Sequence, residues 1–487
     1  MSQALTAIGV ALESLAVTHP HRPALTFGNR TLTRAELESR TNRLARAYLA
    51  QGLRPDTMVT IALPNGIEFV EATVAVWKAG AIPQPVSHHM PPVEREGIID
   101  LAQPSLLIGI DDPSGEGVPA LPPGFEPAAA IPDGPLQPHV ARSLKAPTSG
   151  GSTGRPKLIV AGEEASAEAL QIYAAFARMQ PDGVHLATGP LHHNGPFIFA
   201  MAALTTGCHV VVMPRFDASE SLRLVEQRGV DWMYAVPTMM SRIWRLDPAE
   251  RLGYDLTSLR VVFHTAAPCP VWLKQAWIDW LGPERILELY SGTEAQAVTL
   301  IDGAEWLAHR GSVGRPVVGE IEIRGADGTR PAPGQVGTVW MRRGPSAATT
   351  YHYVGSRARA GEDGWETLGD MGSVDAEGYL YLADRDTDML LVGGSNVYPA
   401  EVEAALAEHP AVIDSCVIGI AHTDLGQVPH ALVHLSEDVS DDALGRHLAE
   451  RLSPYKHPRS FERVNRPLRD DAGKIRRSAL ADRPGRR

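Results

Sequence analysis

A run of small, hydroxylated and basic residues at positions 149–157 has the composition of a phosphate-binding loop. It reads SGGSTGRPK and combines three glycines, three hydroxyls and a lysine. Glycine lets backbone N–H groups approach an anion, while the hydroxyls add donors and the lysine adds positive charge. The spacing excludes the common P-loop, because Pro156 separates Gly154 from Lys157 and no hydroxyl follows the lysine. The run therefore predicts a phosphate site in another fold, with a flexible polar surface loop as the alternative.

A second candidate follows a strand-like segment at residues 286–289 and reads YSGTE, from Tyr290 to Glu294. Ligands of open α/β sheets bind at the carboxyl ends of the strands. Mg²⁺ prefers one or two carboxylates together with phosphate oxygens, so Glu294 is a candidate Mg²⁺ ligand. Taken alone, the motif is also typical of a plain strand-ending turn.

Two more places could bind a nucleotide or its reacting groups. Asp370, in the sequence LGD, could accept hydrogen bonds from ribose hydroxyls, and Arg385 could reach the same ribose or a phosphate. A surface salt bridge is the alternative for both. Lys474 follows a glycine near the end of the sequence, and nothing in its immediate neighbourhood distinguishes it from an exposed lysine.

The segments between these candidates alternate between helical and strand patterns, which predicts parallel sheets covered by helices. Thr33 and Glu36 form a capping box before a helix that ends at Gly52. The sequence changes at residue 319 to short strands and turns, and again after residue 384 to a compact α+β pattern. Strands are predicted at residues 58–63, 106–110, 209–213, 232–236, 259–263, 286–289, 412–420 and 430–435, and helices at 66–78, 219–227, 237–246, 401–408 and 441–452.

Composition sets the broad class. A chain of 487 residues suggests two to four structural units, and 44% hydrophobic with 21% charged residues is typical of globular proteins. The net charge of −12 argues against non-specific nucleic-acid binding. Cys208, Cys269 and Cys416 lack metal-site spacing and are predicted to be reduced thiols. The start does not read as a signal peptide, and the apolar run 197–213 is predicted to be a buried helix and a strand.

In order, the chain shows SGGSTGRPK, GPLHHNGPF, YSGTE, WETLGD, DRDTDMLLVGGSNVYPAEVE and DDAGKIRR. This series resembles the adenylate-forming superfamily of acyl-CoA synthetases, carrier-domain adenylation enzymes and beetle luciferases, over essentially the whole chain. The resemblance implies a large α/β N-terminal domain with parallel-rich sheets and a β-rich subdomain, followed by a small mobile α+β domain. The implied boundaries are 1–384 for the adenylation core, 385–388 for the hinge and 389–487 for the mobile domain.

The resemblance also implies a role for each motif residue. The loop would hold the β- and γ-phosphates, Thr293 would contact the α-phosphate, Glu294 would hold Mg²⁺, and Lys474 would bridge the acyl carboxylate and the α-phosphate. The adenine and ribose would lie against the 266–268 and 290–292 segments, Asp370 and Arg385, while a glycine pair would line the thiol route. The implied nucleotide and CoA residues are Ser149, Gly150, Gly151, Ser152, Thr153, Gly154, Lys157, Ala266, Ala267, Pro268, Tyr290, Ser291, Gly292, Asp370, Arg385, Gly393 and Gly394.

Three positions depart from the family's pattern. Gly150 stands where many members have Ser or Thr, and Leu368 replaces the usual Thr before Gly369. Each change could cost a hydrogen bond. Thr387 lies at the hinge position, where Asp or Lys is frequent, so its role as the hinge is open.

The acyl substrate is predicted from the segment between His192 and Phe197. Relatives that activate amino acids usually place an Asp near the start of the following helix, and no acid occurs here, which favours a non-amino carboxylic acid. The variant is similar to synthetases for bulky acids of the bile-acid, steroid or terpenoid kind; an aromatic acid is also possible in this reading. A core stripe is the alternative for the apolar members of the predicted pocket, which comprises His193, Asn194, Phe197, Tyr234, Met239 and Gly292.

The resemblance thus implies an ATP-, Mg²⁺- and CoA-dependent acid–thiol ligase in the cytoplasm, with His193 on the substrate side of the catalytic site. Its partners would be small molecules, without nucleic acid or a membrane span, and a homodimer is possible. An enzyme that loads a separate carrier protein and a catalytically silent binding module are the competing hypotheses. Lys157, Glu294 and Lys474 argue against the silent module.

Overall fold

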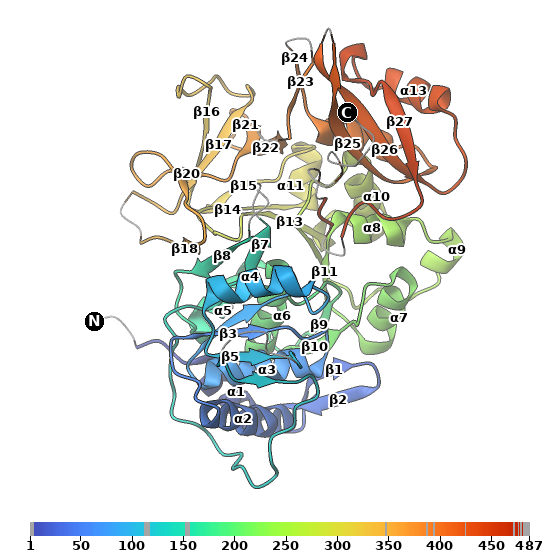
Figure 1. The fold of residues 1–487 in the computed structure, drawn as a ribbon. Helices are drawn as coiled ribbons and strands as arrows, with labels where there is room; N and C mark the ends of the chain where they lie inside the picture. Colours follow the sequence, from blue (N-terminus) through green and yellow to red (C-terminus); the bar gives the residue numbers. More distant parts are fainter. Residues whose placement is uncertain are drawn as a thin grey trace.

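The computed structural model describes residues 4–111, 117–150, 156–345, 348–385, 388–392, 395–423, 425–470, 473–475, 477 and 480, without the side chains of Ser149, Gly150 and Arg385. Within these residues the strands form five sheets, with helices between and around them (Figure 1). No described helix has the length and apolar character needed to cross a bilayer. The α-helices are α1 (Ile8–Thr18), α2 (Arg34–Ala50), α3 (Ile67–Lys78), α4 (Pro92–Ala102), α5 (Ala167–Phe176), α6 (Asn194–Thr205), α7 (Ala218–Arg228), α8 (Pro237–Trp244), α9 (Pro248–Arg251), α10 (Val271–Leu281), α11 (Gly303–Ala308), α12 (Pro399–Ala407) and α13 (Asp441–Ala449).

The largest sheet has the order β15-β14-β13-β12-β11-β9-β10-β1-β2. Its six central strands, from β13 to β1, are parallel to their neighbours, and antiparallel strands close both edges. The strands are β1 (Pro23–Phe27), β2 (Arg30–Thr33), β9 (Val184–Ala187), β10 (His209–Val212), β11 (Trp232–Ala235), β12 (Val261–His264), β13 (Ile286–Tyr290), β14 (Val298–Asp302) and β15 (Arg315–Val318).

Both faces of this sheet are apolar. Trp232 and Tyr234 of β11 belong to one hydrophobic cluster, whereas Met233 and Ala235 belong to another on the opposite face. This alternation is expected of parallel strands that helices cover on both sides. The helices α3 and α6 are buried on nearly all sides and form an interior layer. The α/β fold predicted from the sequence is confirmed.

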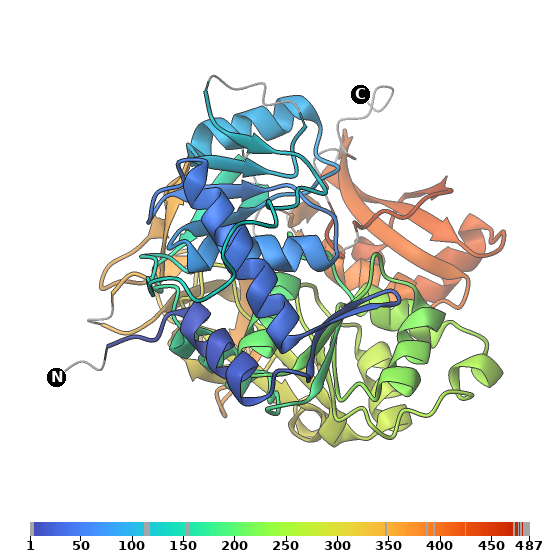
Figure 2. The same ribbon diagram turned by 90° about the horizontal axis from the view of Figure 1, so that it is seen from below.

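Three smaller sheets complete the N-terminal part. A parallel sheet, β4-β3-β5-β6, packs on the interior helices, and Figure 2 shows α1 and α2 crossing the outside of this region. The other two are β18-β8-β7 and the β-rich sheet predicted beyond residue 319. Their strands are β3 (Met58–Ile61), β4 (Ile82–Pro85), β5 (Leu106–Ile108), β6 (Ala120–Leu121), β7 (Thr148–Gly150), β8 (Pro156–Ala161), β18 (Tyr351–Val354), β16 (Glu320–Arg324), β17 (Gly337–Arg342), β19 (Arg359–Ala360), β20 (Glu366–Thr367), β21 (Asp370–Val374) and β22 (Leu380–Arg385).

The C-terminal residues form a sheet with its own hydrophobic core, made with α12 and α13. In Figure 1 this orange-to-red unit lies next to α8 and α10. Arg245, just after α8, donates a hydrogen bond of 2.9 Å to the Ile413 carbonyl and a second to that of Val412, which joins the two parts. The strands are β23 (Leu390–Val392), β24 (Ser395–Val397), β25 (Val412–His422), β26 (Gly426–Leu435) and β27 (Ser460–Val464).

Several local predictions are confirmed at the level of individual residues. The capping box at α2 forms as expected, because the Thr33 side chain and the Glu36 side chain each bind the other residue's backbone N–H. The apolar run 197–213 is divided between α6 and β10, as predicted. The three cysteines are free thiols; Cys208 and Cys416 are buried and Cys269 is partly buried.

Candidate active site

The parallel strands β9, β11, β12 and β13 are adjacent in the large sheet, so the loops after them open at the same edge. His193 follows β9, Thr238 follows β11, Ala266 follows β12 and Glu294 follows β13. Four segments separated by up to a hundred residues are thereby brought together at the carboxyl ends of the strands, where α/β sheets bind ligands.

Glu294 is the centre of a polar cluster at this edge. Its side chain is buried, and its Oε1 accepts a hydrogen bond of 2.5 Å from the Tyr353 hydroxyl. Lys157 Nζ lies 3.6 Å from the same oxygen and 3.8 Å from the centre of the Tyr353 ring. Thr350 Oγ1 donates to the Glu294 carbonyl at 2.6 Å. Burial, and next the nearby Glu294 charge, raise the pKa of Tyr353, which therefore stays a neutral donor.

Neither Tyr353 nor Thr350 could be identified from the sequence as a member of this cluster. Both lie some sixty residues beyond Glu294. The antiparallel pairing of β18 with β8 brings Tyr353 opposite Ile159, and Thr350, just before β18, accepts a 2.8 Å hydrogen bond from the Gly162 N–H. Lys157 lies on the same strand β8 and reaches the carboxylate from the other side. Sheet pairing over such a separation has no local sequence signal.

The second cluster joins two predicted nucleotide residues. The Tyr290 hydroxyl donates to Asp370 Oδ2 at 2.7 Å, and Asp370 is paired with Arg385 across β21 and β22. Leu368 packs directly over the backbone of Gly292: a Cβ on Gly292 would lie 2.3 Å from Leu368 Cδ1. Leu368, in place of the family's Thr, therefore fills the space above the turn, and a Cβ at position 292 would also lie 2.8 Å from Glu294 Oε2.

The remaining nucleotide residues are distributed as follows. Ser149 and Gly150 lie on β7, paired with Lys157 and Pro156 of β8. Ser291 Oγ donates to the Ala297 carbonyl at 2.8 Å, and Thr293 is half-buried in the turn after β13. Four residues of the phosphate loop, the glycine pair and the hinge position lie outside the described residues; these are Gly151, Ser152, Thr153, Gly154, Gly393, Gly394 and Thr387.

Two non-glycine residues at this edge have left-handed backbone. Ala266 has φ of 77° and begins the predicted adenine segment with Ala267 and Pro268, of which Ala266 and Pro268 are exposed. Ala295, directly after Glu294, has φ of 54°. Non-glycine residues with this backbone conformation are strained, and they persist only where the surrounding structure holds them in place. Such residues cluster at functional sites.

The start of α6 carries the predicted substrate-side residues. His193 is the N-cap residue, and its ring centre lies 4.4 Å from that of His192. Burial lowers the pKa of His192 to about 3, so its imidazole is neutral. The charge of Asp470 acts in the opposite direction on this pKa. Asn194 Oδ1 accepts a hydrogen bond of 2.7 Å from Lys145 Nζ, a residue that the sequence did not single out.

The apolar members of the predicted pocket lie in the hydrophobic core. Phe197, Tyr234 and Met239 are each at most 2% exposed and belong to the main hydrophobic cluster. The Tyr234 hydroxyl would touch any Cβ added to Gly195, at 2.5 Å. These residues have the core placement that was the alternative to the pocket, since α6 begins at the candidate site and continues into the interior.

Lys474 reaches the site edge from the C-terminal part. Its turn closes through hydrogen bonds of Lys474 N to Asp470 Oδ1 and of Gly473 N to Asp470 O, both 2.8 Å long. Gly473 packs on the start of α8, where a Cβ would lie 3.3 Å from Thr238 Oγ1 and 3.4 Å from Val236. The lysine side chain is exposed at the edge that holds the other candidates.

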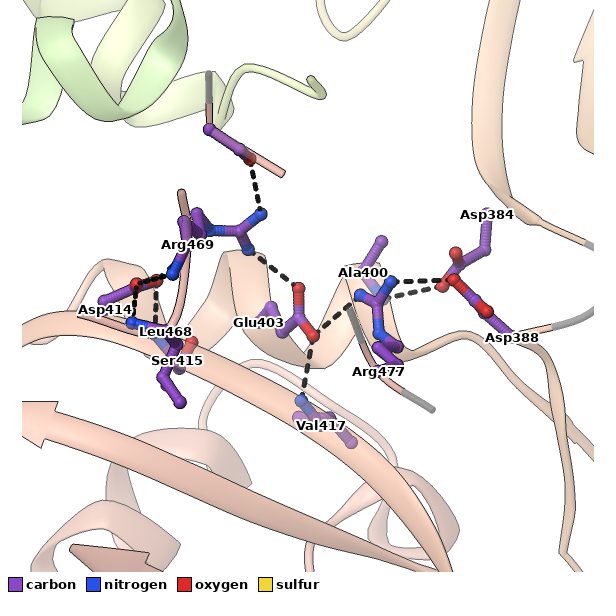
Figure 3. Close-up of polar contacts among 11 residues, drawn as sticks. Asp384, Asp388, Ala400, Glu403, Asp414, Ser415, Val417, Leu468, Arg469 and Arg477 are labelled. Carbon is purple, nitrogen blue, oxygen red and sulfur yellow. Dashed lines mark hydrogen bonds and ion pairs between the residues drawn. The ribbon is translucent and has the colours of Figure 1, made fainter. Parts of the chain in front are cut away.

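A buried carboxylate braces this turn from behind (Figure 3). Glu403 of α12 accepts hydrogen bonds from Arg469 (3.0 Å), Arg477 (2.8 Å) and the Val417 N–H (2.8 Å), so the same side chain holds residues on both sides of Lys474. Asp414 adds a 3.1 Å bond to Arg469. The sequence did not indicate this network.

The network continues to the segment between the two parts of the chain. Arg477 also donates to Asp388 at 2.8 Å. Asp384 accepts a 2.8 Å bond from the N–H of Ala400, in the first turn of α12. A carboxylate at that position stabilises the positive end of the helix.

Comparison with known proteins places this geometry among nucleotide-dependent enzymes. The family described as AMP-binding enzyme matches residues 12–352, and the AMP-binding enzyme C-terminal domain matches residues 401–474. A 3-[(3aS,4S,7aS)-7a-methyl-1,5-dioxo-octahydro-1H-inden-4-yl]propanoyl:CoA ligase of Mycobacterium tuberculosis is 30% identical, over 98% of this chain and 99% of its own. A feruloyl-CoA synthase of an Amycolatopsis species is 30% identical, over 96% of both chains. The structure of o-succinylbenzoate CoA synthetase from Bacillus subtilis with its acyl-adenylate intermediate is similar, with a TM-score of 0.84, 26% identity and coverage of 97% and 98%.

Proposed function

Since this chain belongs to the family of AMP-binding enzymes, we propose that it is an AMP-forming acyl-CoA ligase for a hydrophobic, non-amino carboxylic acid. An oxygen of the acid attacks the α-phosphorus of ATP, a P–O bond forms, and the bond to pyrophosphate breaks. The thiol of CoA then attacks the acyl-adenylate, loses its proton, forms the thioester and releases AMP.

The observation that carries this proposal is the meeting of two distant segments at one sheet edge. Glu294 and Lys157 lie there from the N-terminal part, and Lys474 is delivered by a braced turn packed on Thr238 and Val236. A reaction between two anions needs such positive charge, because the carboxylate and the phosphates repel each other. Lys157 would face the β- and γ-phosphates, while Lys474 would bridge the carboxylate and the α-phosphate.

The residues fit a Mg²⁺ ion that enters with ATP. Among the described residues, no group of three or more His, Cys, Asp or Glu could hold a metal. Mg²⁺ typically binds one or two carboxylates and completes its shell with phosphate oxygens and water, which a single buried Glu294 suits. Bound there, the ion would neutralise phosphate charge; Tyr353 and Lys157 hold the carboxylate in place before it binds.

The other nucleotide contacts follow from the second cluster. Asp370, already fixed by the Tyr290 hydroxyl, would accept the ribose hydroxyls together with Arg385, and Tyr290 would lie near the adenine. We further propose that residues 1–384 form the adenylation core, 385–388 the hinge and 389–487 the mobile domain. Rotation at the hinge would withdraw Lys474 and bring Gly393 and Gly394 to the thiol route, a gating step of a known kind.

The class of acid rests on the substrate-side segment and on relatives. No acidic residue that could hold an amine lies between His192 and Phe197. The 30% identical relatives are named for an indane-dione propanoic acid and for ferulic acid, both with ring systems. We therefore propose a bulky ring-bearing acid, of the steroid-derived or aromatic type.

The test is a panel of acids assayed twice, for pyrophosphate release and for CoA-thioester formation. Ring-bearing acids should give both products, and Lys474→Ala should lower adenylation about a hundredfold, as expected for loss of a preorganised charge partner. Lys456→Ala is the matched control, because Lys456 pairs with Glu401 on the same part of the chain. Adenylation without any CoA product would favour an enzyme that loads a carrier protein. Undiminished adenylation by Lys474→Ala would contradict the mechanism.

A further inference from the structure

The six lysines of this chain are few enough to compare one by one. They are Lys78, Lys145, Lys157, Lys274, Lys456 and Lys474. Three of them, Lys78, Lys145 and Lys274, are buried, with at most 7% of the residue exposed. Burying an ammonium group is costly unless a negative group accompanies it, so each of the three should have a carboxylate partner.

Two of the buried lysines meet this expectation. Lys78 Nζ lies 2.7 Å from Glu38 Oε2, and it also donates to Asn42 Oδ1 at 2.7 Å. Lys274 Nζ donates to Glu288 Oε2 at 2.5 Å. Both lysines are therefore buried as ion pairs.

Lys145 is the exception. It is 3% exposed and donates to Asn194 Oδ1 at 2.7 Å, but no carboxylate of the described residues lies within ion-pair distance of it. Glu163 and Glu294 act on its charge only from farther away, and Glu163 accepts a 3.0 Å bond from Tyr173. Burial lowers the pKa of Lys145 to about 8, so the group is still mainly charged at neutral pH.

The position of Asn194 extends this positive region toward the start of α6. Asn194 is the first residue of α6, whose amino end carries the positive end of the helix dipole. Because its Oδ1 accepts from Lys145, its amide N–H groups point away from the lysine. Asn194 is only half-buried, whereas Lys145 lies behind it, directly before the strand β7 that carries Ser149.

We propose that Lys145 and Asn194 form an oxyanion subsite whose missing negative partner is an oxygen of a bound substrate. The oxygen belongs either to a phosphate of ATP or to the carboxylate of the acid, the two anions that the proposed function brings to this edge. The subsite joins Lys145, which precedes strand β7, to the substrate-side helix α6, two segments that the sequence treats as separate. This inference rests on the proposed function for the identity of the substrates.

Replacing Lys145 should not lower the stability of the unliganded protein, whereas replacing a lysine that stabilises the fold should lower it. Lys145→Met removes a buried charge that has no counter-ion, so the unliganded variant should be as stable as the wild type or more stable. Lys78→Met is the matched control: it removes the same type of bond to an asparagine and also leaves the Glu38 carboxylate without its cationic partner, so its melting temperature should fall. A structural role for Lys145 would lower the melting temperature in the same way.

Ligand binding provides the second readout. The wild-type protein, Lys145→Met and Lys78→Met are titrated calorimetrically with MgATP. For each of them, KM is measured for the best acid of the panel. Lys145→Met should weaken one ligand about tenfold or more, since a charged hydrogen bond contributes 1.5–3 kcal/mol. A weaker Kd for MgATP assigns the oxygen to a phosphate, and a raised KM for the acid with unchanged MgATP binding assigns it to the carboxylate.

A second variant keeps the proposal testable if Lys145→Met does not fold. Asn194→Ala, at a half-buried position, should weaken the same ligand by a smaller factor. Kd and KM values within twofold of the wild type in both Lys145→Met and Asn194→Ala would overturn the proposal. Calorimetry with MgATP needs no turnover, so a wild-type protein without ligase activity would refute the proposed function and leave the phosphate arm still measurable.

Discussion

Replacing Glu403 by glutamine tests whether the brace behind Lys474 serves the first half of the reaction. Glu403 is 6% exposed and accepts three hydrogen bonds, from Arg469, Arg477 and the Val417 N–H. Glutamine has nearly the same shape but no charge, and its amide nitrogen cannot accept. One arginine therefore faces a donor, and each arginine loses one of its two carboxylate partners.

The size of the effect follows from burial. Each arginine side chain is 20% exposed, so its pair is only partly screened by solvent. We expect a loss of about 2–3 kcal/mol from the two pairs together, below the 3–5 kcal/mol of fully buried pairs. Asp414 still holds Arg469, Asp388 still holds Arg477, and the C-terminal core is untouched. The variant should remain folded, with a looser turn at Lys474.

A displacement of about 1 Å at a reacting group can cost about a hundredfold in rate, so adenylation should fall between ten- and a hundredfold. Adenylation is measured by ATP–pyrophosphate exchange, and the second step by thioester formation from preformed acyl-adenylate. Because Lys474 belongs to the first step, the second should change less than twofold. Glu401→Gln, on the same helix and paired with Lys456, is the control and should affect neither step.

An equal loss in both half-reactions would show that Glu403 maintains the fold of the C-terminal part rather than the position of Lys474. The same conclusion would follow if Glu401→Gln and Glu403→Gln behaved alike. If Glu403→Gln has normal stability and an unchanged rate of ATP–pyrophosphate exchange, the turn at Lys474 keeps its geometry without the Glu403 carboxylate.

Three further changes test other parts of the site and fold. Asp370→Asn should raise KM for ATP about tenfold and abolish discrimination against 2′-deoxy-ATP, as expected for loss of a charged hydrogen bond; retained discrimination would place the ribose elsewhere. Gly292→Ala should impair ATP binding because its Cβ would lie 2.3 Å from Leu368 Cδ1 and 2.8 Å from Glu294 Oε2, and the added change Leu368→Ala should relieve the first contact and restore binding in part; a double variant no better than Gly292→Ala would assign the whole effect to Glu294. His185 has a pKa lowered to about 3 by burial, so the unfolded chain takes up its proton first as pH falls below 6.5, and stability decreases there. In urea titrations, His185→Phe should reduce the loss between pH 7 and pH 5 by about 2 kcal/mol; an unchanged loss would contradict the assignment to this histidine.

Much of the fold could be predicted from local patterns. The capping box of Thr33 and Glu36, the division of residues 197–213 into helix and strand, and the turn after β13 all depend on neighbours in sequence. Periodicity and capping act over a few residues, so they can be recognised without knowing the fold. The placement of Glu294 at a carboxyl edge follows from the same argument.

The partners of the site residues could not be found this way. Tyr353 meets Glu294 through the pairing of β18 with β8, and Leu368 covers Gly292 from a different sheet. Lys145 looked ordinary because an isolated lysine gives no sign of its burial. Such contacts depend on how distant segments pack together. Sequences with the same local pattern need not have the same packing.

The sequence by itself determined the chemistry available to this protein: a glycine- and hydroxyl-rich loop with Lys157, a strand-ending Glu294, and Lys474 near the C-terminal end. These groups can be recognised in the sequence because their charges and hydrogen-bond donors belong to the residues themselves. Only the tertiary structure decided which of them act together, since the parallel order of the strands sets the common edge and Glu403 sets the approach of Lys474. It alone also shows that Lys145 is a buried charge without a carboxylate partner among the described residues, because burial and pairing exist only once distant segments have packed.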